Sequence, residues 1–184
     1  MPLHQEKKEY TIKDYESFPE DVRVELIDGQ IFYQAAPVQI HQELLGYLYA
    51  AIFNYIRSNK GPCKVFPAPF AVRLNKDDKT TVEPDIIVVC DKDKLDGKRC
   101  NGAPDWIIEI ISPSTSRHDY IRKLALYESA GVREYWIVDP ENQMVTVYCF
   151  GTEYLFPKQY GFTDTIKACI YEDLFIDFSD IDIE

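Results

Sequence analysis

Three acidic residues stand in stretches of the sequence that are otherwise apolar. Glu25 lies in VELIDG, Asp85 in EPDIIVV and Glu109 in WIIEIIS. A carboxylate within an apolar strand is costly unless it is paired with a base, protonated or bound to a metal ion. Glu109 is the clearest case, because isoleucine stands on both of its sides. Taken alone it is explained equally well by a functional site and by a basic partner near the strand end.

Two further residues carry groups that could act with these acids. Lys123 lies in a helical pattern, with Tyr120 and Tyr127 on the adjacent turns. A lysine that lies over tyrosines at the protein surface is the simpler explanation of this pattern. His41 stands at the start of another helical segment, where a histidine is more often structural.

The segments that must position these residues can be read from their apolar periodicity. Residues 39–58 repeat apolar side chains at three- and four-residue spacing, which predicts a long helix. Thr11 begins a short helical segment, and the Asp28-Gly29 pair between two apolar stretches predicts a β-hairpin. A second long helix is expected from Ser116 to Gly131. Its core face is predicted to hold Ile121, Leu124 and Ala125.

Three apolar runs predict the centre of a sheet. IIVVC, WIIEII and YWIVD are typical of strands that are buried on both faces. The helix between the last two runs predicts that these strands are parallel and joined by a right-handed crossover. The expected fold is therefore a single α/β domain over residues 1–184, with a mixed central sheet flanked by helices.

Composition narrows the class of protein. The chain has 184 residues and a net charge of −11, of which six acids lie in the acidic end, residues 172–184. This charge counts against tight, nonspecific binding of DNA by a monomer. The sequence predicts neither a membrane segment nor a secretory signal, and hence a cytoplasmic protein. The five widely spaced cysteines are expected to be small core residues, with neither a zinc site nor disulfides. They are Cys63, Cys90, Cys100, Cys149 and Cys169.

The order of Glu25, Asp85, Glu109 and Lys123 resembles the PD-(D/E)XK, or restriction-endonuclease-like, superfamily. Pro84 and Asp85 supply the PD dipeptide, and Glu109 supplies the second acid. More specifically, the chain is similar over roughly residues 10–178 to the Uma-two family of putative restriction endonucleases. The matching stretches are VELIDGQI, VEPDIIVV, PDWIIEIISPST and GVREYWIVDP, together with His41 and the run Asp119, Lys123 and Tyr127.

The resemblance implies a metal-dependent endonuclease that hydrolyses phosphodiester bonds of DNA. It implies Mg²⁺ or Mn²⁺ held by Asp85, Glu109 and the backbone carbonyl of Ile110, with Glu25 bound directly or through water. Lys123 would orient the attacking water or stabilise charge on the phosphate. The expected supporting residues are His41, Tyr127 and Ser112.

One departure from the superfamily pattern keeps an alternative open. The motif places a lysine two residues after the second acid, where this chain has Ile111. In this branch the lysine is thought to come from the following helix, which points to Lys123. The alternative is a catalytically silent domain that keeps the fold and binds nucleic acid or protein. A purely structural dimeric domain would leave the three strand acids unexplained. A homodimer is expected, because closed two-fold pairs are the commonest oligomers and cutting both strands of a duplex suits two sites.

Overall fold

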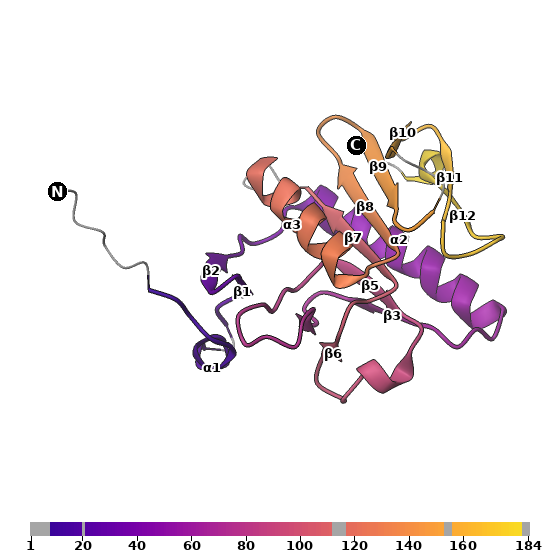
Figure 1. The fold of residues 1–184 in the computed structure, drawn as a ribbon. Coiled ribbons are helices and arrows are strands. Elements are labelled where there is room, and N and C mark those ends of the chain that lie inside the picture. Colours follow the sequence, from indigo (N-terminus) through magenta and orange to yellow (C-terminus); the bar gives the residue numbers. More distant parts are fainter. Residues whose placement is uncertain (1–7, 20, 112–116, 153–155, 182–184) are drawn as a thin grey trace.

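The computed structural model describes residues 8–19, 21–111, 117–152 and 156–181, built around a six-stranded mixed sheet (Figure 1). The strand order is β10-β9-β8-β7-β5-β3. The bounds of these strands are β3 Lys64–Pro67, β5 Ile86–Val89, β7 Trp106–Ile110, β8 Glu134–Asp139, β9 Met144–Cys149 and β10 Lys158–Gly161.

The three apolar runs lie side by side at the centre of this sheet, as the sequence predicts. β5, β7 and β8 are neighbours, and all residues of β5 and β7 are buried. β7 and β8 are parallel, with Ile108 paired to Trp136, and every other pairing in the sheet is antiparallel. The mixed α/β fold is thus confirmed.

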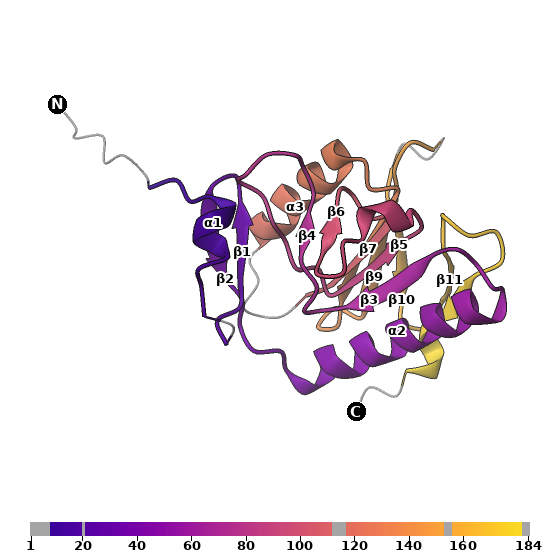
Figure 2. The ribbon, with the colours of Figure 1, turned by 90° about the horizontal axis from the view of Figure 1, so that it is seen from below.

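The two long helices cover opposite faces of the sheet (Figure 2). Helix α2, Gln39–Ser58, has the predicted bounds and buries Leu44, Leu48 and Ile52 against one face. Helix α3, Arg117–Ala130, lies over the other face, where Tyr127 packs with Ile107 and Tyr135.

The buried face of α3 differs from the predicted one. Ile121 is 61% exposed, Ala125 is exposed and Leu124 is half-buried, whereas Lys123 and Tyr127 are buried. The prediction assumed that apolar side chains mark the buried stripe of this helix. It is wrong here because α3 presents a lysine and a tyrosine to the acids below it. Gly131, with φ +94°, stands one residue beyond the helix end as expected.

A small N-terminal unit forms the rim of the α3 face. Strands β1, Val24–Ile27, and β2, Gln30–Tyr33, form the predicted hairpin, with Asp28 and Gly29 both at positive φ in its turn. Leu26 bonds to Thr81 in both directions, which fastens the hairpin to the rest of the domain. The other short elements here are α1 Ile12–Tyr15, β4 Val72–Arg73, 3-10 helix η1 Lys92–Lys94 and β6 Cys100–Asn101.

The C-terminal part packs on the α2 face. It consists of β11 Thr165–Lys167, β12 Phe175–Asp177 and 3-10 helix η2 Phe178–Asp180. Glu134, fully buried in β8, accepts hydrogen bonds from the N–H groups of Cys169 and Ile170 and from the indole of Trp136. Among the described residues, no helix is both long and apolar enough to cross a membrane.

The cysteines depart from the sequence prediction. The structure pairs Cys63 with Cys90 and Cys149 with Cys169, while Cys100 is free and buried. The expectation of unpaired cysteines is wrong because β3 and β5 pair Lys64 with Val89, which places Cys63 and Cys90 opposite each other one step further on. The cysteines therefore no longer support a cytoplasmic location, which stays a prediction.

Candidate active site

The sheet register brings Asp85 beside Glu109. β5 and β7 pair Ile86 with Ile108, so one further step along both strands sets Asp85 at the level of Glu109. The Asp85 carboxylate fixes this end of the sheet, because its Oδ2 accepts the Ile110 N–H at 2.8 Å. Asp85 thereby takes the place of a backbone acceptor where the ladder ends.

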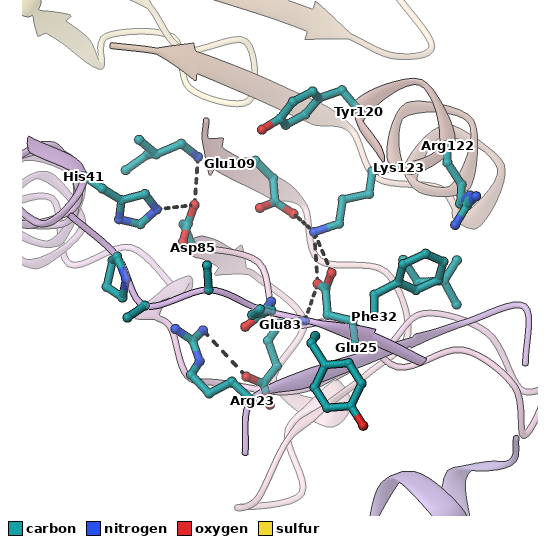
Figure 3. Close-up of a pocket in the computed structure, with 17 residues that line it drawn as sticks. Arg23, Glu25, Phe32, His41, Glu83, Asp85, Glu109, Tyr120, Arg122 and Lys123 are labelled. Carbon is teal, nitrogen blue, oxygen red and sulfur yellow. Dashed lines mark hydrogen bonds and ion pairs between the residues drawn. The ribbon is translucent and has the colours of Figure 1, made fainter. Parts of the chain in front are cut away.

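Lys123 joins two of the acids across the α3 face. Its ammonium lies 2.9 Å from Glu109 Oε1, and 3.0 and 2.9 Å from Oε1 and Oε2 of Glu25 (Figure 3). All three residues are buried. Glu25 is held further by the Glu83 N–H, which bonds its Oε1 at 3.0 Å. The predicted approach of Lys123 to Glu109 is confirmed.

Tyr127 completes the surroundings of Glu109. Its hydroxyl, one turn along α3 from Lys123, donates to Glu109 Oε1 at 2.6 Å. Burial, reinforced by the Glu109 carboxylate, raises the pKa of Tyr127 well above its ordinary value, so the hydroxyl keeps its proton. Tyr127 therefore acts as a hydrogen-bond donor that orients the Glu109 carboxylate.

The protonation of the cluster reflects burial as well as charge. Burial raises the pKa of Glu109 to about 7; Lys123 opposes this shift, and the Asp85 and Glu25 carboxylates add to it. Burial acts to lower the pKa of Lys123, but the two glutamates outweigh it and the net direction is upward. Lys123 therefore stays protonated at neutral pH, whereas burial brings the pKa of Glu109 close to neutrality.

His41 contacts the third acid from the opposite side of the site. Its Nε2 lies 3.1 Å from Asp85 Oδ2, and its ring is buried at the start of α2. The sequence singled out this residue only by its place at the helix start. The structure adds that its ring contacts a site acid.

These side chains line one pocket of about 280 Å³. Glu25, Asp85, Glu109, Lys123 and His41 all contribute to its walls, so the three acids converge as predicted. Tyr127 lies behind Glu109. Ser112, the remaining predicted supporting residue, lies outside the described residues.

The pocket also holds charged and aromatic residues that the sequence reading missed. Arg23, Glu83 and Arg122 line it, and the Arg122 guanidinium lies 4.7 Å from the centre of the Phe32 ring. Arg23 stands two residues before Glu25 and Arg122 next to Lys123, so adjacency to a predicted site residue was the available signal. Nothing in the sequence shows that the hairpin lies against α3.

The carboxylates offer oxygen ligands of the kind a hard cation prefers. Within the described residues, Asp85 and Glu109 each have one oxygen engaged by protein donors, and Asp85 Oδ1 and Glu109 Oε2 accept no hydrogen bond. This donor set fits Mg²⁺ or Mn²⁺. Across the same residues no three His, Cys, Asp or Glu side chains gather closely enough to form a ready-made metal site. The reason is that Lys123, already a cation, stands between Glu25 and Glu109.

Comparison with known proteins places this arrangement in context. No curated protein matches the sequence. One solved structure, described as a putative nuclease belonging to DUF820 from Anabaena variabilis ATCC 29413, has the same fold. The match has a TM-score of 0.75 and 20% sequence identity, and covers 93% of this chain and 96% of the other. The model of the Uma2 family, described as putative restriction endonucleases, matches residues 11–174. Because this model covers most of the sequence, the chain belongs to the Uma2 family.

Proposed function

We propose that the chain is a metal-dependent endonuclease that hydrolyses phosphodiester bonds of DNA, with Mg²⁺ or Mn²⁺ as its cofactor. The observation that carries the proposal is the contact of the Lys123 ammonium with Glu109 and Glu25 in the pocket that Asp85 also lines. It supplies the lysine that the superfamily motif requires, in place of Ile111. Family membership and the nuclease-like fold support the same conclusion.

Asp85, Glu109 and the Ile110 carbonyl would hold the ion. Glu25, whose two oxygens both lie at 3.0 Å or less from Lys123, would reach it through water. The ion supplies the charge that polarises a phosphate oxygen and lowers the pKa of a bound water. His41 and the Ile110 N–H hold Asp85 Oδ2, so Oδ1 would be the oxygen of Asp85 available to an ion.

The chain's own groups would perform the remaining tasks. Lys123 has three N–H donors, and a phosphate oxygen that enters the pocket would take one of them. The positive charge of the ammonium would then stabilise the negative charge that develops on the phosphate during attack by water. Tyr127 holds Glu109 at the same oxygen that Lys123 contacts, so both donors fix one carboxylate rotamer.

Incubation of the protein with linear and circular DNA in Mg²⁺ or Mn²⁺ tests the proposal. We expect cleavage that chelation of the metal stops. Isothermal titration of the ion alone separates metal binding from catalysis. Absence of both cleavage and metal binding would contradict the proposal.

The catalytically silent domain is the second candidate. One observation favours it: Lys123 is already paired with two carboxylates, an arrangement that by itself neutralises buried charge. Metal binding without cleavage under any condition would select this alternative.

A further inference from the structure

Buried polar atoms without partners gather at the pocket. Among the described residues, eight buried side-chain atoms have no hydrogen-bond partner. Three of them, Arg23 Nε, Gln34 Oε1 and His41 Nδ1, belong to residues that line this one pocket. A buried polar group without a hydrogen-bond partner lowers stability, so proteins rarely keep several together without a partner molecule or water. The polar wall near Arg23 is therefore a candidate binding surface.

Of these three residues, Arg23 is the charged one whose Nε–H donor lacks a hydrogen-bond acceptor in the described ranges. Its Nη2 lies 3.8 Å from Glu83 Oε2, which is beyond hydrogen-bond distance, and its side chain is 34% exposed. Glu83 is already engaged, because the Tyr15 hydroxyl donates to its Oε1 at 2.8 Å. Figure 3 shows the Arg23 guanidinium on the side of the pocket that holds Asp85 and His41. Its donors are available next to the acids of the proposed active site.

Three other arginines of the chain have partners in the described ranges. Arg99 lies 2.8 Å from Glu16, and Arg133 lies 3.2 Å from Asp105. Arg122 stacks over the Phe32 ring. Arg23 is set apart by a buried Nε that has no hydrogen-bond partner in the described ranges although the residue lines a pocket.

The anchoring of Arg23 suits a fixed binding group. The residue directly precedes β1, and its carbonyl accepts the Gln34 N–H at 3.0 Å, which extends the hairpin by one pair. The backbone is thus held at the rim while the guanidinium reaches inward. A planar guanidinium matches the paired oxygens of a phosphate and cannot lose its proton.

We propose that Arg23 forms a phosphate-binding site for the substrate strand, next to Asp85 and Glu109. The ligand class is a phosphodiester of a nucleic-acid strand, and this inference rests on the proposed nuclease function. The site answers an electrostatic problem, because four carboxylates line the pocket that a polyanion must enter. Arg23 offsets part of that charge at the point where Lys123 is already committed to Glu25 and Glu109.

Binding of a labelled single-stranded oligonucleotide of about ten nucleotides tests the site. This length lies within the roughly 4–16 nucleotides that one OB-fold domain covers when it binds a single strand. Fluorescence anisotropy is measured with Mg²⁺ in an Asp85→Asn background, which the proposed mechanism makes inactive, using DNA and RNA versions. Adding Arg23→Met should weaken binding about tenfold. It should also reduce the slope of log K against log salt by about 0.7, the value for one lost single-strand phosphate contact. Arg23→Lys, which keeps the charge but not the fork, should lie between.

Two matched variants separate a phosphate contact from a change in net charge or stability. Arg99→Met removes the same charge from a half-buried site that is paired with Glu16 and lies outside the pocket, and it should leave binding unchanged. Glu83→Gln removes the acid nearest Arg23 and should keep or strengthen binding. The unfolding midpoint of Arg23→Met should remain close to that of the parent. If Arg23→Met fails to fold, the oligonucleotide titrations of Arg23→Lys and Glu83→Gln test the phosphate site instead.

The possible results distinguish failure of the phosphate site from failure of the nuclease function. Equal binding by the parent and Arg23→Met, an equal loss in Arg99→Met, or no binding of either oligonucleotide would overturn the phosphate site. Cleavage by the parent together with an unchanged KM in Arg23→Met would overturn it while the nuclease function stands. Arg23-dependent binding without cleavage by the parent would leave the phosphate site intact and reject the nuclease. Comparison of the DNA and RNA oligonucleotides identifies which type of nucleic acid supplies the phosphate.

Discussion

At the scale of single residues, the site depends on how buried charges are paired. Lys123 lies within 3.0 Å of oxygens from two glutamates, and Tyr127 adds a hydrogen bond to Glu109. Removal of one member of a buried ion pair costs far more than the pair itself contributes, because the remaining charge is left without compensation. Substitutions here should therefore alter stability and chemistry in separable ways.

Lys123→Met should abolish cleavage while the protein retains its metal ion. The variant leaves Glu25 and Glu109 without their cation, so the metal-free protein should lose about 3–5 kcal/mol of stability. Mg²⁺ should restore much of that loss, since the ion replaces the missing positive charge. Thermal unfolding with and without Mg²⁺ measures this effect, with Lys79→Met, which breaks the exposed pair with Glu9, as the control. Parental cleavage by Lys123→Met would show that the lysine has no role in catalysis.

Asp85→Asn should remove the metal without disturbing the fold. An asparagine keeps an oxygen that can accept the Ile110 N–H, so the end of β7 stays bonded. It lacks the negative charge, so affinity for Mn²⁺ should fall at least tenfold and cleavage should cease. Isothermal titration measures the Mn²⁺ affinity. The unfolding midpoint checks that the fold is undisturbed. Unchanged Mn²⁺ affinity in this variant would exclude Asp85 as a ligand.

The sequence predicted the site acids because each one interrupts an apolar run, and the register then brought them together. It could not predict Arg23 or Gln34 as pocket residues, since their position depends on where the hairpin docks. The Ile110 carbonyl stays a predicted ligand; the structure shows instead that the N–H of the same residue binds Asp85.

At the scale of elements, predictions succeeded where local periodicity decides the outcome. Helix α2 and the hairpin turn at Asp28-Gly29 follow from apolar spacing and turn chemistry. The weaker end of the chain resolves into β10, β11 and β12, short strands that carry little periodic signal. The buried face of α3 was misjudged because contacts with two carboxylates hold Lys123 in a buried position, whereas Ile121 is exposed. Cysteine pairing was missed because it depends on register between distant strands.

Glu134, in β8, should make the free energy of unfolding depend on pH. Burial raises the pKa of this carboxyl from 4.5 to about 7, against the hydrogen bonds from Cys169, Ile170 and Trp136. A raised folded-state pKa means that the contribution of Glu134 to stability is full below pH 4.5 and is lost as pH rises through 7. Glu134→Gln should flatten this decline in urea-unfolding measurements between pH 4.5 and 8. It should also cost about 1–3 kcal/mol, because one amide oxygen cannot replace two carboxylate oxygens.

For that measurement, Glu128→Gln on the exposed surface of α3 is the matched control. It removes the same charge without a buried hydrogen bond. A pH dependence that persists unchanged in Glu134→Gln would assign the effect to another group.

At the scale of the whole molecule, charge and assembly constrain how the protein meets its substrate. The net charge of −11 includes the acidic end on residues 172–184, and that segment packs on the α2 face as far as it is described. The pocket opens on the α3 face, so the sheet separates it from much of this negative charge. Cutting both strands of a duplex would suit two copies of the pocket.

A homodimer is therefore the expected state in solution. Light scattering coupled to size-exclusion chromatography should give twice the chain mass of 21.4 kDa. Two-fold pairing would supply the second site and increase affinity for a long strand by holding both sites on it. A monomeric mass over the whole accessible concentration range would contradict the expectation.

The large sequence separation between Glu25 and Lys123 has a consequence during synthesis on the ribosome. The two residues are 98 positions apart, so the partner of Glu25 does not exist when the hairpin emerges. At about 5–20 residues per second, the hairpin waits roughly 5–20 s for that partner. During this interval the nascent chain holds Glu25, and later Asp85 and Glu109, without the lysine that completes the proposed catalytic set. An incomplete chain released early would thus be incapable of attacking nucleic acid, whatever else of the fold it had acquired.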